Sequence, residues 1–89
     1  MAWKVELDKS AEKELDKLDR QTAKRILVFL NERVSKRDDP RSIGEALKGA
    51  KLGNLWKYRV GDYRIIADIQ DKVLRIYVLR LGNRREIYR

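Results

Sequence analysis

The stretch that decides the fold is LWKYRVGDYRIIADIQDKVLRIYVLRL, residues 55–81. It divides into runs rich in β-branched and aromatic residues, joined by Gly61-Asp62 and Gln70-Asp71, which suit tight hairpin turns. Within the last run, Val73 to Leu79 is apolar on both alternating sets of positions except at Arg75, which indicates a central strand covered on both faces. The stretch therefore predicts an antiparallel meander of three strands: Leu55–Val60, Tyr63–Gln70 and Lys72–Leu81.

The residues before this stretch predict one strand and two helices. Residues 3–7 alternate between apolar and charged side chains, as a strand with one buried face does. Ser10 is a suitable N-cap for a first helix, and Asp19 can cap a second helix. The second helix is expected to end near Lys36, because Asp38-Asp39-Pro40 breaks helices. Apolar residues recur at helical spacing in both: Ala11, Leu15 and Leu18, then Ala23, Ile26, Leu27, Leu30 and Val34.

The order of elements is therefore β-α-α-β-β-β, and we expect an α+β fold with two layers. The connection between the helices is short, so the two helices should form a hairpin whose apolar stripes cover one face of the antiparallel sheet. The other face is expected to stay partly open, with basic residues along its strands. A length of 89 residues suits one domain, residues 1–89.

The positive charge is concentrated in the second half of the chain. Residues 1–47 contain 11 Lys and Arg against 10 Asp and Glu, whereas residues 48–89 contain 11 against 4. Most of the net charge of +8 therefore lies in the second half, and such one-sided excess is typical of a phosphate-facing surface. We interpret this half as built to bind a polyanion, RNA in particular. The alternative is a basic protein with no nucleic-acid partner.

The residue types that are missing limit the chemistry. The chain has no Cys and no His, which excludes disulfides, thiolate-bound metals and the usual acid/base group at neutral pH. No metal site and no cofactor are expected, because the carboxylates of the second half form no ligand cluster. No apolar run approaches the roughly 20 residues of a membrane span, and no secretory leader is evident. We therefore expect a cytoplasmic protein without membrane contact.

Basic residues are expected to converge at one edge of the predicted sheet. In a meander, the end of the first strand, the start of the second and the end of the third lie together. Arg59, Arg64 and the tail that contains Arg84 and Tyr88 should therefore meet, with Lys57 one step further in. Arginine binds phosphate through two parallel hydrogen bonds, and tyrosine can stack on a base. Such a cluster can bind RNA.

The same residue types could also cleave RNA. Attack of the 2′-OH on the adjacent phosphate needs a base, cations that stabilise the phosphorane, and an acid for the leaving oxygen. Arginines supply the cations. A lysine or tyrosine could act as base or acid only if neighbouring cations bring its pKa from about 10 towards neutrality. From spacing alone, RNA binding without catalysis is the simpler interpretation.

The C-terminal sequence YRVGDYRIIADIQDKVLRIYVLRLGNRREIYR, residues 58–89, resembles the corresponding half of RelE-type toxins of the RelE/ParE superfamily. The most specific segments are GDYRI, residues 61–65, and GNRREIY, residues 82–88. The N-terminal strand and two helices also fit. The resemblance implies a RelE-like fold and a toxin that cleaves mRNA in the ribosomal A site by metal-independent 2′-OH attack.

The resemblance also implies roles for individual residues. Arg64 and Arg84 match the arginines that bind the phosphate and stabilise the transition state. Tyr88 matches the tyrosine that orients or activates the 2′-OH, and Lys57 matches one of a pair of strand lysines with acid/base or electrostatic roles. We therefore take Lys57, Arg64, Arg84 and Tyr88 as the catalytic candidates.

Two positions depart from the family pattern. Leu55 stands where the second strand lysine is expected, so that function is missing or is carried by Lys51 or Arg59. Asn83 stands where many relatives have histidine, so a histidine cannot supply the proton here. Both departures make the acid and base the least determined part of the implied mechanism.

The resemblance further implies partners. A cognate antitoxin would wrap around the toxin and would be its only link to operator DNA, while the ribosome, through its small-subunit RNA, and mRNA would bind the basic surface. Val28 and Phe29 lie off the apolar stripe of the second helix and are candidate antitoxin contacts. The candidate RNA contacts outside the catalytic group are Lys48, Lys51, Arg59, Arg80 and Arg85.

Two alternatives remain beside the nuclease. ParE-like toxins share the superfamily fold but inhibit DNA gyrase and have no nuclease activity. A non-catalytic RNA-binding module would need the arginines but not the hydroxyl of Tyr88. The combined presence of the four catalytic candidates favours the nuclease, because gyrase inhibition does not require that set.

Overall fold

The computed structural model describes residues 3–47, 55–83 and 85. Its helices and strands confirm the predicted element order and add one short strand before the meander. They are β1 (Lys4–Leu7), α1 (Lys9–Asp16), α2 (Arg20–Val28), a π-helical segment (Phe29–Val34) that continues α2, a 3₁₀ helix (Pro40–Ile43), β2 (Glu45–Ala46), β3 (Leu55–Val60), β4 (Tyr63–Gln70), a 3₁₀ turn (Asp71–Val73) and β5 (Arg75–Asn83).

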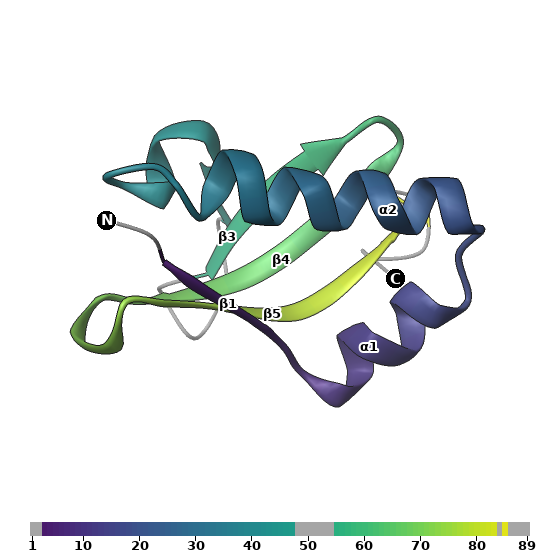
Figure 1. The fold of residues 1–89 in the computed structure, drawn as a ribbon, viewed down its shortest axis with the longest axis horizontal. Coiled ribbons are helices and arrows are strands. Elements are labelled where there is room, and N and C mark those ends of the chain that lie inside the picture. Colours follow the sequence, from purple (N-terminus) through teal and green to yellow (C-terminus); the bar gives the residue numbers. More distant parts are fainter. Residues whose placement is uncertain (1–2, 48–54, 84, 86–89) are drawn as a thin grey trace.

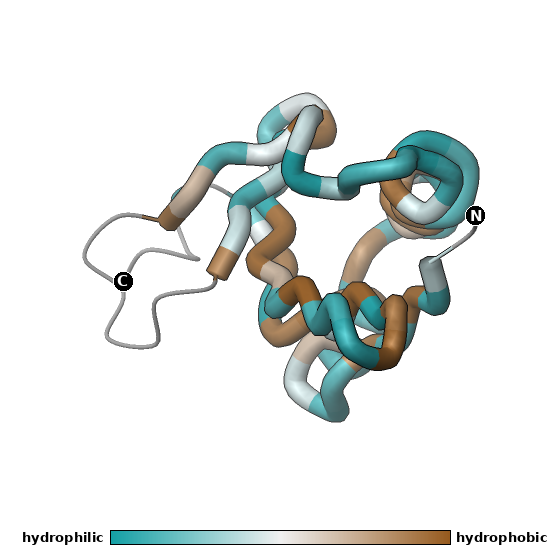
Figure 2. The backbone as a smooth tube through the Cα atoms, turned by 90° about the vertical axis from the view of Figure 1, so that its left-hand side faces the viewer, coloured by the Kyte–Doolittle hydropathy of each residue, from teal (hydrophilic) through white to brown (hydrophobic). Residues whose placement is uncertain are grey.

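The strands form one five-stranded sheet in the order β1-β5-β4-β3-β2. β3, β4 and β5 are antiparallel neighbours, as predicted, and β1 pairs parallel to β5. Figure 1 shows α2 lying across the sheet and α1 lying beside β5. In Figure 2, which looks along α2, the helix is seen end-on in a layer of its own beside the strands. The predicted two-layer α+β fold is confirmed.

The two links within the meander differ. Gly61 has φ of +58°, the left-handed conformation that glycine adopts without steric cost, and with Asp62 it makes the predicted two-residue turn. The second link is longer than predicted, because residues 71–73 form a 3₁₀ turn and Leu74 follows with φ of +50°. β5 therefore starts at Arg75 instead of at Lys72.

Two further expectations are corrected. The N-cap of α1 is Asp8 instead of Ser10: β1 ends at Leu7, and the Asp8 carboxylate accepts a hydrogen bond from the Ser10 amide at 3.2 Å. The N-cap of α2 is Asp19, as predicted, and accepts from the Thr22 amide. β5 is not covered on both faces, because only Ile76, Val78 and Leu81 enter the core, while Tyr77 and Leu79 are half-buried.

The core lies between α2 and the sheet. Ile26, Leu30 and Val34 are fully buried, which confirms three of the five residues of the predicted stripe, whereas Ala23 and Leu27 are only half-buried. They pack over strand residues such as Ile65. Tyr58 is also buried and donates a hydrogen bond from its hydroxyl to the Pro40 carbonyl oxygen at 2.7 Å. Burial raises the pKa of this hydroxyl to about 12, so it remains a donor. The core thereby also holds the segment that precedes β2.

Strand alternation places the basic residues on the face opposite α2. Tyr58 and Ile65 are paired and point into the core, so their neighbours Arg59 and Arg64, which are also paired, point to the other face. We call this second side the open face. Among the described residues, no helix is long and apolar enough to cross a membrane.

Candidate nucleic-acid interface

The end of β3, the start of β4 and the end of β5 lie side by side at one edge of the sheet. Arg59 is directly opposite Arg64, and Arg64 is opposite Gly82. Lys57 lies one step further in on the same face, opposite Ile66. We call this region the basic edge. Arg84 and Tyr88, which were expected to join it, lie outside the described residues, as do Lys48 and Lys51.

Arg64 is the central cation of the basic edge. It is only 8% exposed, and its guanidinium donates hydrogen bonds to the carbonyl oxygens of Gly61 and Tyr63, both at 3.1 Å. Within the described part of the chain, no carboxylate forms an ion pair with it. A buried charge without a counterion is costly, so an anion that reaches this guanidinium would be strongly stabilised.

Arg59 adds a second positive charge across the strand pair. Its side chain is exposed, and like charges directly opposite each other in a sheet destabilise it by a few tenths of a kcal/mol to about 1 kcal/mol. No ion pair to Arg59 is found among the residues described. The pair Arg59 and Arg64 therefore lowers stability in the free protein and would be relieved by a bound phosphate.

Lys57 forms an ion pair with Glu45, a residue that the sequence analysis did not identify. Its Nζ lies 3.5 Å from Oε2 of Glu45, and Glu45 is directly opposite Lys57 in the β2–β3 register. The Lys57 side chain is mostly covered, whereas Glu45 is exposed. Because β2 has only two residues, it leaves no periodic pattern from which Glu45 could have been identified. The site thus contains one carboxylate beside its lysine.

Arg80 and Arg85 differ from Arg59 in their surroundings. Arg80 forms an ion pair with Glu14 of α1 at 3.3 Å, and Glu14 also accepts a hydrogen bond from the backbone amide of Leu81. The positive charge of Arg80 is therefore already balanced by Glu14. Arg85 is exposed, and its backbone amide donates to Oδ1 of Asn83 at 3.0 Å. Of the predicted RNA contacts that are described, Arg59 and Arg85 remain the available cations.

A shallow depression of about 480 Å³ adjoins the basic edge on the side of α1. Its aromatic residue is Tyr63, whose backbone precedes Arg64. The lining residues are Glu14, Lys17, Leu18, Tyr63, Leu81, Gly82, Asn83 and Arg85. Tyr63 is half-buried and packs against the core, and strand alternation turns its side chain away from the face on which Arg64 lies. The depression is therefore a separate surface beside the basic edge.

The opposite end of the open face is also charged, but its charges are matched. Arg75 forms an ion pair with Glu6 at 3.2 Å and donates to Gln70, and the Tyr77 hydroxyl donates to Asp8 at 2.6 Å. The bond from Tyr77 holds the pKa of Asp8 below its usual range. A hydrogen bond to Lys4 is the main cause of the lowered pKa of Glu6. We call this region the paired end.

The structure separates the two candidate antitoxin contacts. The Val28 side chain on α2 is 48% exposed. The Phe29 ring packs edge-on against Tyr58, with ring centroids 6.1 Å apart. Phe29 is therefore mainly a core residue with a partly open edge, and Val28 is the residue of the two that reaches solvent. Among the described residues, no group of Asp and Glu side chains is arranged to hold a metal ion.

Comparison with known proteins gives a family and a fold. The family described as ParE toxin of type II toxin-antitoxin system, parDE, matches residues 5–88. No curated protein matches the chain by sequence. In the RelBE2 toxin–antitoxin complex of Mycobacterium tuberculosis, one chain is 23% identical with a TM-score of 0.84, covering 97% of this chain and 95% of that chain.

Two further solved structures are similar to this chain in fold. The isolated RelE toxin of E. coli is 22% identical with a TM-score of 0.73, covering 98% of this chain and 92% of that chain. A chain of the archaeal RelE–RelB complex from Pyrococcus horikoshii is 28% identical with a TM-score of 0.69, covering 97% of this chain and 99% of that chain. The resemblance noted in the sequence thus extends over the whole fold.

Proposed function

The chain belongs to the ParE toxin family, within the RelE/ParE superfamily of type II toxin–antitoxin toxins, and from this premise we propose that it is a ribosome-dependent endoribonuclease. Its substrate is mRNA in the ribosomal A site. The observation that carries the proposal is Arg64, a buried guanidinium that has carbonyl partners but no carboxylate among the described residues. A structural arginine at such a position would be expected to have an acidic partner.

The proposed reaction uses the RNA's own hydroxyl and protein side chains. The 2′-OH gives up its proton as its oxygen attacks the adjacent phosphorus, the bond from phosphorus to the 5′ oxygen breaks, and that 5′ oxygen takes up a proton. The products are a 2′,3′-cyclic phosphate and a 5′-OH. Arg64, with Arg84, binds the phosphate and stabilises the extra charge of the phosphorane. Tyr88 orients the 2′-OH, and Lys57, held by Glu45, adds positive charge near the leaving oxygen. No cofactor is needed for this step.

The proposed partners follow from the same function. The ribosome presents mRNA, and small-subunit RNA meets the exposed cations Arg59 and Arg85 together with Lys48 and Lys51. RNA must displace Glu14 to reach Arg80. A cognate antitoxin neutralises the toxin and provides its only contact with operator DNA. The related toxins of Mycobacterium tuberculosis and Pyrococcus horikoshii are found in complexes with their antitoxins. The proposed compartment is the cytoplasm, where translation takes place.

The test is a translating extract to which the protein is added, with mRNA ends mapped by primer extension. The parent should produce cuts within A-site codons, and Arg64→Ala, Arg84→Ala and Tyr88→Phe should each weaken them. Arg75→Ala is the matched control, because Arg75 lies on the same face but is ion-paired with Glu6. Intact mRNA with the parent protein would refute the nuclease. Equal cleavage by all variants would refute the residue assignment while sparing the function.

A second function is favoured by one observation. The matching family is described by its ParE member, and ParE-like toxins inhibit DNA gyrase. A supercoiling assay with purified gyrase distinguishes the two. Inhibited supercoiling together with intact mRNA would support the gyrase inhibitor. A non-catalytic RNA-binding module would instead bind ribosomes without producing new mRNA ends, and Tyr88→Phe would leave that binding unchanged.

A further inference from the structure

The last part of β5 has a strand partner on one side only, within the described residues. β4 pairs with β5 as far as Asn83, whereas β1 pairs with it only over residues 75–78. Beyond Val78, the backbone groups on the outer edge of β5 therefore need other partners, because a buried amide without a hydrogen bond is costly. α1 lies beside β5 in Figure 1 and provides such a partner.

That partner is Glu14. Its Oε1 accepts a hydrogen bond at 3.3 Å from the backbone amide of Leu81, a residue that is fully buried. A Cβ atom at position 82 would lie 3.6 Å from Oε2 of Glu14, so the carboxylate also lies beside Gly82, the residue directly opposite Arg64. α1 is itself fixed, because Ala11 is fully buried in the core. Glu14 thus ties the end of β5 to α1 at the point where β5 pairs with Arg64.

The same carboxylate also binds Arg80. Nε of Arg80 lies 3.4 Å from Oε1 of Glu14, and Nη2 lies 3.3 Å from Oε2, which makes two parallel contacts. The Glu14 side chain is 26% exposed and that of Arg80 is 48% exposed. A guanidinium and a backbone amide are also donors that bind phosphate groups of nucleic acids. Glu14 therefore fills a place in which these donors could hold an anion from RNA.

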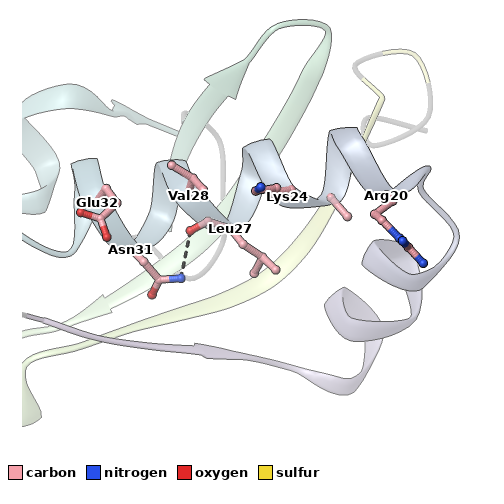
Figure 3. Close-up of a pocket in the computed structure, with 7 residues that line it drawn as sticks. Arg20, Lys24, Leu27, Val28, Asn31 and Glu32 are labelled. Carbon is pink, nitrogen blue, oxygen red and sulfur yellow. Dashed lines mark hydrogen bonds between the residues drawn. The ribbon is translucent and has the colours of Figure 1, made fainter.

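An acidic residue on the other helical segment forms a different kind of bond. Glu32 lines a depression of about 420 Å³ along α2, shown in Figure 3. Its ion pair is with Lys36, four residues further along the chain. That ion pair joins neighbouring turns and reaches no strand. The bonds of Glu14 cross from a helix to the sheet, so a change at Glu14 acts on the end of β5.

We propose that Glu14 is a positioning residue of the RNA site and has two separable effects. Through the amide of Leu81, Glu14 fixes the end of β5 opposite Arg64, and the chain continues from this end into Arg84; this bond raises the rate of cleavage. Through Arg80, Glu14 withholds a cation from RNA; this ion pair weakens RNA binding. The inference rests on the proposed function, because an effect on the rate requires the nuclease.

The test measures single-turnover cleavage in the translating extract over a range of toxin concentrations. Glu14→Gln keeps an acceptor for the Leu81 amide but loses the charge. Its maximal rate should stay within about twofold of the parent, and the toxin concentration that gives half of this rate should fall a few-fold, because Arg80 becomes available. Glu14→Ala loses both bonds. It should show the same fall in concentration, but its maximal rate should drop by about tenfold, as misplaced catalytic groups cause.

Three controls separate positioning from other causes. Glu12→Ala makes the same change at an exposed position of α1 and should alter neither quantity. Arg80→Ala should leave the maximal rate unchanged, and in the Glu14→Gln background it should cancel the gain in affinity. Hydrogen exchange at the Leu81 amide, followed by NMR, should be faster by about tenfold or more in Glu14→Ala and close to the parent in Glu14→Gln. Thermal unfolding confirms that each variant is folded.

The possible contrary results can be told apart. A maximal rate in Glu14→Ala equal to that of the parent would overturn the positioning role and leave the nuclease proposal untouched. An equal loss of rate in Glu14→Gln and Glu14→Ala would show that the charge is needed, which also contradicts a role through the Leu81 amide. An unchanged half-maximal concentration in both variants would overturn the withholding of Arg80. Intact mRNA with the parent protein would refute the nuclease itself, and the inference with it, before any variant is compared.

Discussion

Both ends of the open face contain arginine and tyrosine or lysine side chains, but the residues next to the arginines differ. At the paired end, Arg75 has Glu6 and Gln70 as partners, and Tyr77 has Asp8. At the basic edge, the buried Arg64 has carbonyl partners and faces another cation, Arg59. At the paired end, the charge of Arg75 is balanced by Glu6 within the fold. At the basic edge, neither Arg59 nor Arg64 forms an ion pair with a carboxylate among the described residues.

This difference shows that the number of cations in a sequence does not by itself indicate where an anion-binding site lies. Arg75 and Arg64 lie in neighbouring strands of one sheet face, and both are half-buried or buried. Only the position of the carboxylates distinguishes them.

The largest effect is expected from Arg64→Ala. Loss of a preorganised cation that stabilises transition-state charge lowers the rate of RNA cleavage by roughly 10²–10³-fold. Arg75→Ala should leave that rate within about twofold, because the guanidinium of Arg75 is occupied by Glu6. Single-turnover cleavage in the translating extract measures both. Similar losses in the two variants would show that the two ends do not differ in function.

The next effect comes from giving the basic edge its own counterion. Arg59→Glu places a carboxylate directly opposite Arg64, which would give Arg64 an acidic partner as Arg75 has in Glu6. RNA affinity should fall by about tenfold at low salt, and the dependence of affinity on salt should become weaker, since fewer counterions are released on binding. Fluorescence titration over a range of salt concentrations measures both quantities. Arg59→Gln is the control that removes the charge without reversing it.

A smaller effect of opposite sign is expected from Glu45→Gln. Removing the carboxylate beside Lys57 leaves one more positive charge at the basic edge. RNA affinity should rise by a few-fold, and the salt dependence should become steeper. The same titration tests this, with Glu32→Gln as the control, because Glu32 is paired with Lys36 in and just after the π-helical segment, away from the basic edge. Weaker binding would mean that Glu45 contacts the RNA or positions Lys57 for it.

The smallest effect is expected at the paired end and concerns stability. Tyr77→Phe removes the hydrogen bond that is the main cause of the lowered pKa of Asp8. A carboxylate with a lowered pKa stabilises the native state above its ordinary pKa of 3.8, and this contribution is lost as the pH falls through the lowered value. The variant should therefore be less stable than the parent at neutral pH, and the gap should shrink below about pH 4. Denaturant unfolding at several pH values measures this difference in stability between variant and parent. RNA cleavage should not change.

Much of the site was predictable because it is local. Gly61 and Asp62 make a two-residue turn, so Arg59 and Arg64 must lie opposite each other once β3 and β4 pair. The apolar stripe of α2 and its Asp19 cap follow from helical spacing in the same way. The partners of these residues were not predictable, because Glu45 lies 12 positions before Lys57 and Glu14 lies 66 positions before Arg80. Nothing in either local pattern links them.

By itself, the sequence determined the element order, the meander, the family resemblance and the convergence of Arg59 and Arg64 at one edge of the sheet. These depend on side-chain periodicity and turn chemistry, which act over a few residues. Only the tertiary structure decided that β1 runs parallel to β5, that α1 brings Glu14 to Arg80, and that β2 brings Glu45 to Lys57. Packing of distant segments determines which charges meet, and that is why the structure alone distinguishes the arginines that are ion-paired from those that have no carboxylate partner among the described residues.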